Sequence, residues 1–390
     1  MPTPRPPAPG RLATLQAVRA LAAAMVVVVH LAGPTAFEHK VFGRSLLDPL
    51  WHPAMTGVDL FFVVSGFVMV VTAGGALTGA APRQSLGRFA WRRASRIYPL
   101  YWLVSLALLA VVLAAPQLVH GNGEPTSLPA SFLLLPQAGE PLLLVGWTLV
   151  HEVGFYLVFA LALAVRARWA AWSVLGAWAA VVLVGHLLVP HPSSPWLVVG
   201  FNPMNLEFLL GIGAGCLVLH ARRGGAALLG AGAVVLVLAW ADLGAQGPLL
   251  RDPLVGALVV GTGAALAVAG LALLERDGRL RVPAALARLG DSSYSLYLVH
   301  VPAITLAAIV LARLLPPVGG GAGVAVQLLV VAAVAAGCVL AASLTHRFAE
   351  QPLLRLTRSL ERGRRGVPAE VPAPASPAPE LSGQASTLTA

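Results

Sequence analysis

The segment Leu12–Ala32 reads LATLQAVRALAAAMVVVVHLA, and it is apolar over most of its length although Arg19 and His30 interrupt it. An apolar run of about 20 residues is long enough to cross a bilayer as a helix. Because an arginine breaks the run and no small-residue cleavage site leads into a soluble domain, we expect the segment to remain as a membrane span rather than to be removed as a signal peptide.

Nine further apolar runs of similar length follow along the chain, of which the seventh is short and the least distinct. Only 11% of the 390 residues are charged and 57% are hydrophobic, whereas soluble domains carry roughly 25% charged residues. A soluble enzyme is therefore excluded, and the predicted fold class is an all-α integral membrane protein with about ten transmembrane helices. The predicted spans are Leu12–Ala32, Gly57–Gly74, Ile97–Ala115, Leu142–Val165, Trp169–Val189, Pro203–His220, Ala226–Ala241, Pro253–Leu274, Ser293–Leu315 and Ala325–Thr345.

The basic residues predict the orientation of these spans, because cytoplasmic loops collect lysine and arginine. The chain has 26 basic and 16 acidic residues and a net charge of +10. If the N-terminus is cytoplasmic, 21 basic residues fall in cytoplasmic segments and Arg19 lies within the first span; only Lys40, Arg44, Arg251 and Arg313 lie outside. Both termini are therefore predicted to be cytoplasmic. Since the arginines lie between apolar runs, membrane topology explains them and no nucleic-acid partner is expected.

Three segments are expected along the chain. Residues 1–11 form a short cytoplasmic segment, residues 12–352 the transmembrane domain, and residues 353–390 a cytoplasmic and largely disordered tail, because Gly366–Ala390 is rich in Pro, Ala and Ser and has no periodicity. The largest outer loops, Gly33–Thr56 and Pro116–Pro141, are candidates for a lid over an external site. The chain shows no internal repeat of the kind found in many transporters.

The two cysteines, Cys216 and Cys338, lie far apart in different apolar runs. This placement suggests neither a disulfide framework nor a thiolate metal site, and we expect no bound metal.

Arg19 and His30 are the polar residues of the first span, and an arginine at the centre of a membrane helix costs roughly 2.5–3.5 kcal/mol. Eleven helical residues turn to within about 20° of alignment and climb about 16 Å. Both side chains are thus predicted to face one groove, Arg19 toward the cytoplasm and His30 near the outer surface. The structural alternative is that Arg19 reaches the cytoplasmic headgroups and His30 marks the outer interface.

Asp59 belongs to the stretch GVDLFFVVSGF at residues 57–67, at the predicted outer end of the second span. A carboxylate is favoured at a helix N-terminus, and an Asp beside His30 would orient and polarise the imidazole. The alternative is an ordinary helix cap.

Four arginines occur within nine residues at 88–96. Arg88, Arg92 and Arg96 are spaced by four residues, and Arg93 lies three before Arg96, so a helix would gather them on one basic face. Such a face can bind the phosphates of a cytosolic cofactor. The alternative is an anchor that fixes topology.

Further polar residues occupy other predicted spans. His151 and Glu152 are adjacent in the fourth span and point about 100° apart, so at least one of them is expected to face a polar cavity. In the sixth span, Asn202 and Pro203 predict a helix start that places Glu207 one turn below the outer surface. For His300 in the ninth span, and for Glu350 and Pro352 at the end of the tenth, we favour structural roles.

Six of these segments resemble, in the same order, motifs of the acyltransferase-3 family of integral membrane O-acyltransferases. The resemblance extends from Leu15 to Pro352, and two of its sequences are most similar to the exopolysaccharide O-acetyltransferase branch, GWTL at 146–149 and EFLLG at 207–211. The six segments are the Arg19 to His30 spacing, Gly57–Phe67, Arg92–Tyr101, Trp147–Tyr156, Ser293–His300 and Glu350–Pro352.

The resemblance implies transfer of an acyl group, expected to be acetyl, from cytosolic acetyl-CoA to a carbohydrate hydroxyl outside the bacterial inner membrane. It implies that Arg19 and His30 are the catalytic pair and that Glu152 is a membrane carboxylate. The expected position of Asp59 adds it to these catalytic residues, as an assistant to His30. It also implies that Arg93 and Arg96 are the family's inner motif, whereas His151 matches no required position. Together with the basic face at 88–96, this predicts that Arg92, Arg93 and Arg96 bind the donor. The expected partners are membrane lipid, acyl-CoA, the carbohydrate acceptor and polysaccharide biosynthesis machinery.

Several alternatives stay open at this stage. The acyl group either reaches His30 on a pantetheine arm that threads inward, or it is first carried by an acyl-enzyme. The acceptor is either a polysaccharide, such as exopolysaccharide or O-antigen, or a small natural product such as a macrolide, or peptidoglycan. A polytopic transporter without chemistry is the competing class, and it predicts transport that does not depend on CoA.

Overall fold

The computed structural model describes residues 12–33, 36–73, 85–115, 126–165, 167–314 and 320–363. Within these ranges the secondary structure is helical, without a β-strand. Ten helical segments in the described ranges are long and apolar enough to cross a membrane. The predicted all-α membrane fold and the number of spans are therefore confirmed. Residues 1–11, and 364–390 of the predicted tail, lie outside the described part.

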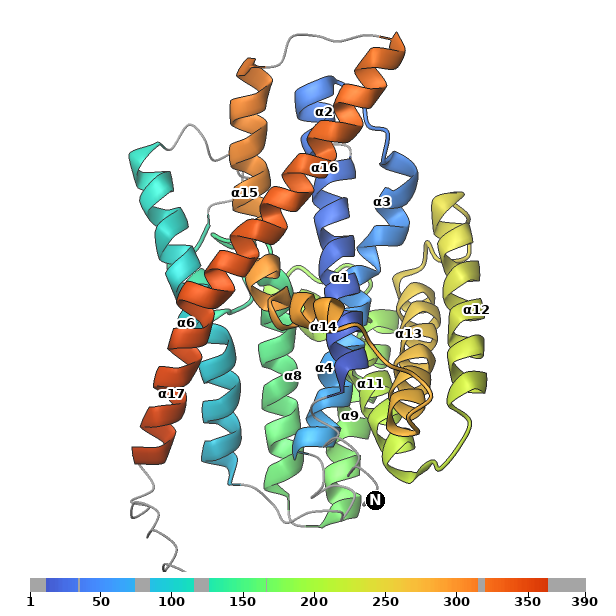
Figure 1. Cartoon of the computed structure of the whole chain (residues 1–390). Coiled ribbons are helices and arrows are strands. Elements are labelled where there is room, and N and C mark those ends of the chain that lie inside the picture. Colours follow the sequence, from blue (N-terminus) through green and yellow to red (C-terminus); the bar gives the residue numbers. More distant parts are fainter. Residues whose placement is uncertain are drawn as a thin grey trace, which may run out of the picture.

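The helices form a bundle in which α1 is central (Figure 1). We call the end where α1 begins and α17 ends the proximal face, and the end that carries α2 the distal face. In chain order the elements are α1 Ala13–Ala32, α2 Phe37–Phe42, α3 Asp48–Met55, α4 Gly57–Ala73, α6 Leu86–Ala114, α7 Leu128–Leu133, α8 Gly146–Ala164, α9 Arg168–Leu188, α10 Pro195–Gly200, α11 Asn205–His220, α12 Gly225–Gly244, α13 Pro253–Arg276, α14 Ala284–Asp291, α15 Ser293–Leu314, α16 Gly320–Thr345, the π-helical turn η3 His346–Glu350, and α17 Gln351–Gly363.

Two spans are broken helices, which the apolar runs did not predict. The second consists of α3 and α4, and the sixth consists of α10 and α11. The predicted outer loop Gly33–Thr56 thus contains both α2 and α3, and the described part of Pro116–Pro141 contains α7. At the C-terminal end of the bundle, the last span continues through α17 to Gly363. The helix therefore extends past the predicted domain boundary at residue 352.

The start of α1 is held by a carboxylate from the end of α13. Glu275 accepts hydrogen bonds from the backbone N–H groups of Ala13 and Thr14, both at 2.8 Å, and from the Thr14 hydroxyl at 2.5 Å. A carboxylate at this position satisfies N–H groups that have no partner within the helix and complements the helix dipole. Because Arg19 lies just over one turn further along α1, Glu275 also helps to set its depth.

Helices α4 and α11 approach each other closely because glycine occupies the crossing point on both. A Cβ atom on Gly66 would lie 2.0 Å from the carbonyl oxygen of Phe208, and one on Gly211 would lie 2.0 Å from that of Val63. Small residues allow such close backbone packing in membranes, where apolar side chains gain little by leaving lipid. The crossing holds α4, which carries several cavity residues, against the rest of the bundle.

We therefore expect Gly211→Ala to destabilise the protein by about 1–3 kcal/mol, the usual cost of overpacking a close contact. Thermal unfolding of purified protein in detergent measures the effect. Gly213→Ala, in the same helix, is the matched control. Apart from the helix's own nearby backbone, no atom lies within 4 Å of a Cβ at position 213. The control should be neutral or slightly stabilising, since alanine favours the helix. Equal unfolding temperatures for the two variants would contradict the packing argument.

Candidate active site

A cavity of about 1010 Å³ lies within the bundle between α1, α4, α6, α8, α15 and α17. Its size is at the upper end of the range for small-molecule sites, roughly 300–1,000 Å³. One end of the cavity lies toward the proximal face and is lined by Thr72 and Glu361. The other end lies deep in the bundle and is lined by Phe61 and Tyr297. Six arginines line the cavity but only three carboxylates, so its charge favours an anionic ligand. These residues are Arg19, Arg92, Arg93, Arg96, Arg355 and Arg358, and Glu152, Asp291 and Glu361.

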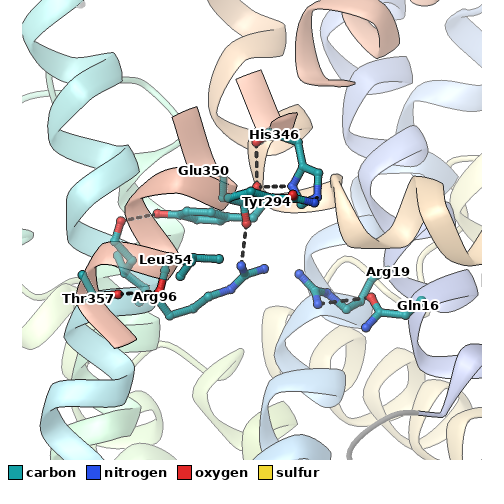
Figure 2. Close-up of polar contacts among 11 residues, drawn as sticks. Gln16, Arg19, Arg96, Tyr294, His346, Glu350, Leu354 and Thr357 are labelled. Carbon is teal, nitrogen blue, oxygen red and sulfur yellow. Dashed lines mark hydrogen bonds and ion pairs between the residues drawn. The ribbon is translucent and has the colours of Figure 1, made fainter. Parts of the chain in front are cut away.

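The predicted arginine face is formed by α6, a single helix that continues from Leu86 into the third span. Arg96 is its most constrained member. Its Nη1 atom donates to Oε1 of the buried Glu350 at 2.5 Å, and its guanidinium lies over the Tyr294 ring at 5.4 Å (Figure 2). Ser295 and His346 hydrogen-bond the other oxygen of Glu350 at 2.7 and 2.8 Å. Glu350 thus joins α6, α15 and η3, which agrees with the structural role expected for it.

Arg93 is held by weaker contacts and has no carboxylate partner in the described part of the chain. Its guanidinium lies 5.7 Å from the ring centres of Phe89 and Tyr156, and Nη2 donates to the Thr72 hydroxyl at 3.3 Å. Its buried Nε atom has no hydrogen-bond partner among the described residues. A guanidinium at the cavity wall with unused donor capacity is suited to an anion that enters the cavity.

The two arginines nearest the start of α6 pair with α17. Arg88 and Arg92 approach the same carboxylate, Glu361, at 3.8 and 3.6 Å. The Trp91 indole donates to the backbone oxygen of Thr357 at 3.3 Å. These contacts place α17 beside α6 along the cavity, which Arg355 and Arg358 of α17 also line.

Arg19 projects from α1 into the same cavity. Its Nη1 atom contacts Oε1 of Gln16 at 3.3 Å, and its guanidinium points toward that of Arg96 (Figure 2). Two guanidinium groups that face each other in a membrane protein repel unless an anion or a polar medium lies between them. The structure therefore brings Arg19 to the arginine cluster rather than to His30.

Glu152 faces the cavity, as the sequence predicts for at least one member of the His151–Glu152 pair. It accepts hydrogen bonds from the Ser65 hydroxyl at 3.0 Å and from the Tyr156 hydroxyl. The buried His151 points elsewhere and contacts Oδ1 of Asn205 at 2.9 Å. Glu152 thus links α4 and α8 through hydrogen bonds on the side of the cavity that these two helices form.

His30 lies beyond the end of the cavity that is deep in the bundle, and it is not part of the cavity lining. The rings of Phe61 and Tyr297, whose centres are 5.7 Å apart, line that end. Tyr297 is 6.0 Å from the ring of His300, and His300 is 4.8 Å from the ring of His30. A layer of aromatic side chains therefore separates the arginine-lined cavity from His30, which is half-buried.

Among the described residues, no hydrogen bond or ion pair joins Asp59 to His30, which it was expected to orient. Gly57 packs against Ala22 and Val26 of α1, so α4 begins about one turn below His30. The carboxyl group of Asp59 is instead close enough to that of Glu207 on α11 for the two to interact electrostatically, and neither Glu207 oxygen has a hydrogen-bond partner among the described residues. The physical reason is the break between α3 and α4, which moves the start of α4 away from the surface and into the bundle.

Arg355 and Arg358 were not predicted as site residues, because both lie in the segment expected to be a largely disordered tail. The pattern QPLLRLTRSLERG at residues 351–363 repeats basic residues every three or four positions, which is typical of an amphipathic helix. That signal was sufficient to predict α17. The contact between His300 and His30 could not be predicted, because 270 residues separate them.

Comparison with known proteins identifies the kind of chemistry this arrangement supports. A family profile described as an acyltransferase domain, acyltransferase-3, matches residues 12–345. The chain belongs to this acyltransferase family. Like other members, the acyltransferase is expected to transfer groups other than aminoacyl groups, and the resemblance stated from the motifs is confirmed.

Two relatives support the assignment. The acyltransferase is 32% identical to the exopolysaccharide production protein ExoZ of Rhizobium meliloti, over 78% of this chain and 90% of the relative. It is 30% identical to the acyltransferase MdmB of Streptomyces mycarofaciens, over 97% of this chain and 99% of the relative. No solved structure matches the acyltransferase.

Proposed function

We propose that this protein transfers an acyl group, acetyl in the simplest case, from cytosolic acyl-CoA to a hydroxyl of a carbohydrate outside the bacterial inner membrane. The observation that carries the proposal is the arginine-rich cavity, which extends toward the face that the basic residues assign to the cytoplasm. His30 lies on the other side of an aromatic layer, on the distal side. If the donor binds from one side of the membrane and the acceptor from the other, the donor cavity and the catalytic histidine are expected to be separated in this way.

The donor is proposed to bind with its phosphates at the proximal arginines. Arg92, Arg93 and Arg96 supply guanidinium groups from α6, and Arg355 and Arg358 supply two more from α17. Arginine matches phosphate oxygens with paired donors, which lysine cannot do. A coenzyme with a diphosphate and a further phosphate has the charge that such a cavity favours.

The reaction at His30 is proposed to use general-base catalysis. Nε2 of the neutral imidazole removes the proton of the acceptor hydroxyl while its oxygen attacks the thioester carbonyl. The carbon–sulfur bond then breaks, and the imidazolium returns the proton to the departing thiolate. Arg19, below the aromatic layer, is proposed to hold the donor as its acyl end passes toward His30.

The acceptor is proposed to be a surface polysaccharide, because one relative is named as an exopolysaccharide production protein. This assignment also suggests that the protein works beside polysaccharide biosynthesis machinery in the membrane. The second relative is named only as an acyltransferase, and the chain matches almost its whole length. A small-molecule acceptor is therefore the alternative to be tested directly.

Membranes with and without the protein are to be incubated with labelled acetyl-CoA and surface polysaccharide, and the products analysed by mass spectrometry. We expect label on the polysaccharide as an O-acetyl ester that mild base removes. Free glycans and hydroxylated small molecules are to be offered in parallel reactions. Label only on a small molecule would replace the acceptor, whereas no CoA-dependent product with any acceptor would favour a transporter.

The proposed orientation predicts which surface positions an impermeant thiol reagent can reach. In a variant without Cys216 and Cys338, we expect Lys40→Cys to be labelled in intact cells and Ser85→Cys only after permeabilisation, because the two positions lie toward opposite faces. Both residues are exposed, so access is matched. Labelling of Ser85→Cys in intact cells would reverse the orientation and the direction of transfer.

A further inference from the structure

His300 of α15 is fully buried, and its side chain meets that of His30. The Nε2 atom of His300 lies 3.3 Å from Nδ1 of His30, and the two rings meet edge-on at 73°. No other described residue hydrogen-bonds this Nε2 atom. A buried imidazole whose Nε2 atom contacts a second imidazole is poorly explained by packing alone, since leucine fills such a space without burying a polar atom.

The backbone around the pair determines where the protons lie. Nδ1 of His30 is 2.9 Å from the carbonyl oxygen of Val26, and Nδ1 of His300 is 3.0 Å from that of Leu296. A carbonyl oxygen only accepts, so each neutral imidazole carries its single proton on Nδ1. Each Nε2 atom is then a bare acceptor. The lone pair of His300 consequently faces the Nδ1–H group of His30.

We infer that His300 is a positioning residue for His30: together with the Val26 carbonyl, it holds His30 as the Nδ1–H tautomer and keeps Nε2 bare toward the acceptor hydroxyl. The inference rests on the proposed function, in which His30 is the base. When Nε2 takes the hydroxyl proton, the positive charge spreads to Nδ1–H, and His300 accepts that hydrogen bond more strongly. No proton leaves the pair through His300.

A neutral imidazole suits this place in the protein. A carboxylate would stabilise the protonated His30 more strongly, but an unpaired carboxylate in a membrane interior costs several kcal/mol. Asp59 is the acid that the sequence suggested for this role, and its carboxyl group interacts with that of Glu207 instead. His300 therefore supplies the acceptor that orients the base without adding a charge.

The test compares three replacements of His300 in purified protein, with acetyl transfer from acetyl-CoA followed as kcat and KM. His300→Leu removes the acceptor and keeps the bulk, so we expect kcat to fall roughly 10- to 100-fold while the donor KM stays within about twofold. His300→Gln retains an oxygen that reaches His30 and should stay within roughly fivefold of wild type. His300→Asn introduces a side chain as polar as glutamine but one methylene shorter, which does not reach His30. Its kcat should therefore match that of His300→Leu.

His151→Leu is the matched control, because it removes another buried histidine with one side-chain partner. It should lower the unfolding temperature without the selective loss of kcat. If His300→Leu does not fold, the comparison of glutamine with asparagine still decides the matter. ¹⁵N NMR of labelled histidines gives a second readout: His30 should change from the Nδ1–H form to a tautomer mixture in His300→Leu.

Wild-type kcat in His300→Leu, or equal kcat in the glutamine and asparagine variants, would overturn the role of His300 while leaving His30 as the base. Retained activity in His30→Ala would instead overturn the assignment of His30 as the base, on which the inference rests. The two failures are thus distinguishable in one set of proteins.

Discussion

Replacement of His30 by alanine is expected to lower acyl transfer by roughly 10²–10⁴-fold, the usual contribution of a positioned general base. A sugar hydroxyl is a poor nucleophile at neutral pH until its proton is removed. The geometry leaves Nε2 of His30 as the free acceptor, because Nδ1 is already engaged by Val26 and His300. Transfer from labelled acetyl-CoA in membranes matched for expression measures the loss.

Two further observations make this result specific. His30→Gln should be as inactive as His30→Ala, because an amide is not a base, and both proteins should still bind CoA since His30 does not line the arginine cavity. Wild-type turnover in His30→Ala would show that another group removes the proton. His151 and His300 would then be the next histidines to replace.

The second large effect is expected at Arg93, whose replacement by alanine should weaken acetyl-CoA binding by about 1.5–3 kcal/mol, the usual worth of a hydrogen bond to a charged group. This corresponds to roughly a 10- to 150-fold rise in Kd. Arg93 is a cleaner test than Arg96, because Arg96→Ala would also leave the buried Glu350 without its cation. Titration of purified protein with acetyl-CoA measures the change.

Arg93→Lys should restore only part of the affinity, because lysine lacks the paired donors of a guanidinium. Arg168→Ala is the matched control for net charge, since Arg168 is exposed at the start of α9 and does not line the cavity. Arg358→Ala should resemble Arg93→Ala if α17 forms part of the donor site. Unchanged affinity in an Arg93→Ala/Arg96→Ala double variant would leave these arginines as topological anchors.

The local patterns predicted several features of the site correctly. The spacing of Arg88, Arg92 and Arg96 predicted a basic helical face, and α6 forms it. The side-by-side polar residues of the fourth span predicted that one faces a cavity, and Glu152 does. Such predictions succeed because helical periodicity and the cost of a charge in lipid act within one helix and need no knowledge of its neighbours.

Predictions that depended on the position of one helix against another were less successful. Asp59 was placed beside His30 because both were expected near the outer ends of their spans. The break before α4 instead lowers Asp59 to the level of Glu207, and the gap beside His30 is filled by His300. Apolar composition predicts a span that begins at Gly57, where α4 does begin, but it does not predict how deep that start lies beside α1.

The sequence by itself determined that this protein is a ten-span helical membrane protein of the acyltransferase-3 family, with its basic residues gathered on one side, because hydropathy, length and charge act locally along the chain. Only the tertiary structure decided which polar groups meet: Arg96 with Glu350, Asp59 with Glu207, and His30 with His300. These pairs join residues 148 to 270 positions apart in the chain, which are brought together by the packing of broken and close-crossing helices. That packing depends on the shapes of many side chains at once, and no single stretch of sequence encodes it.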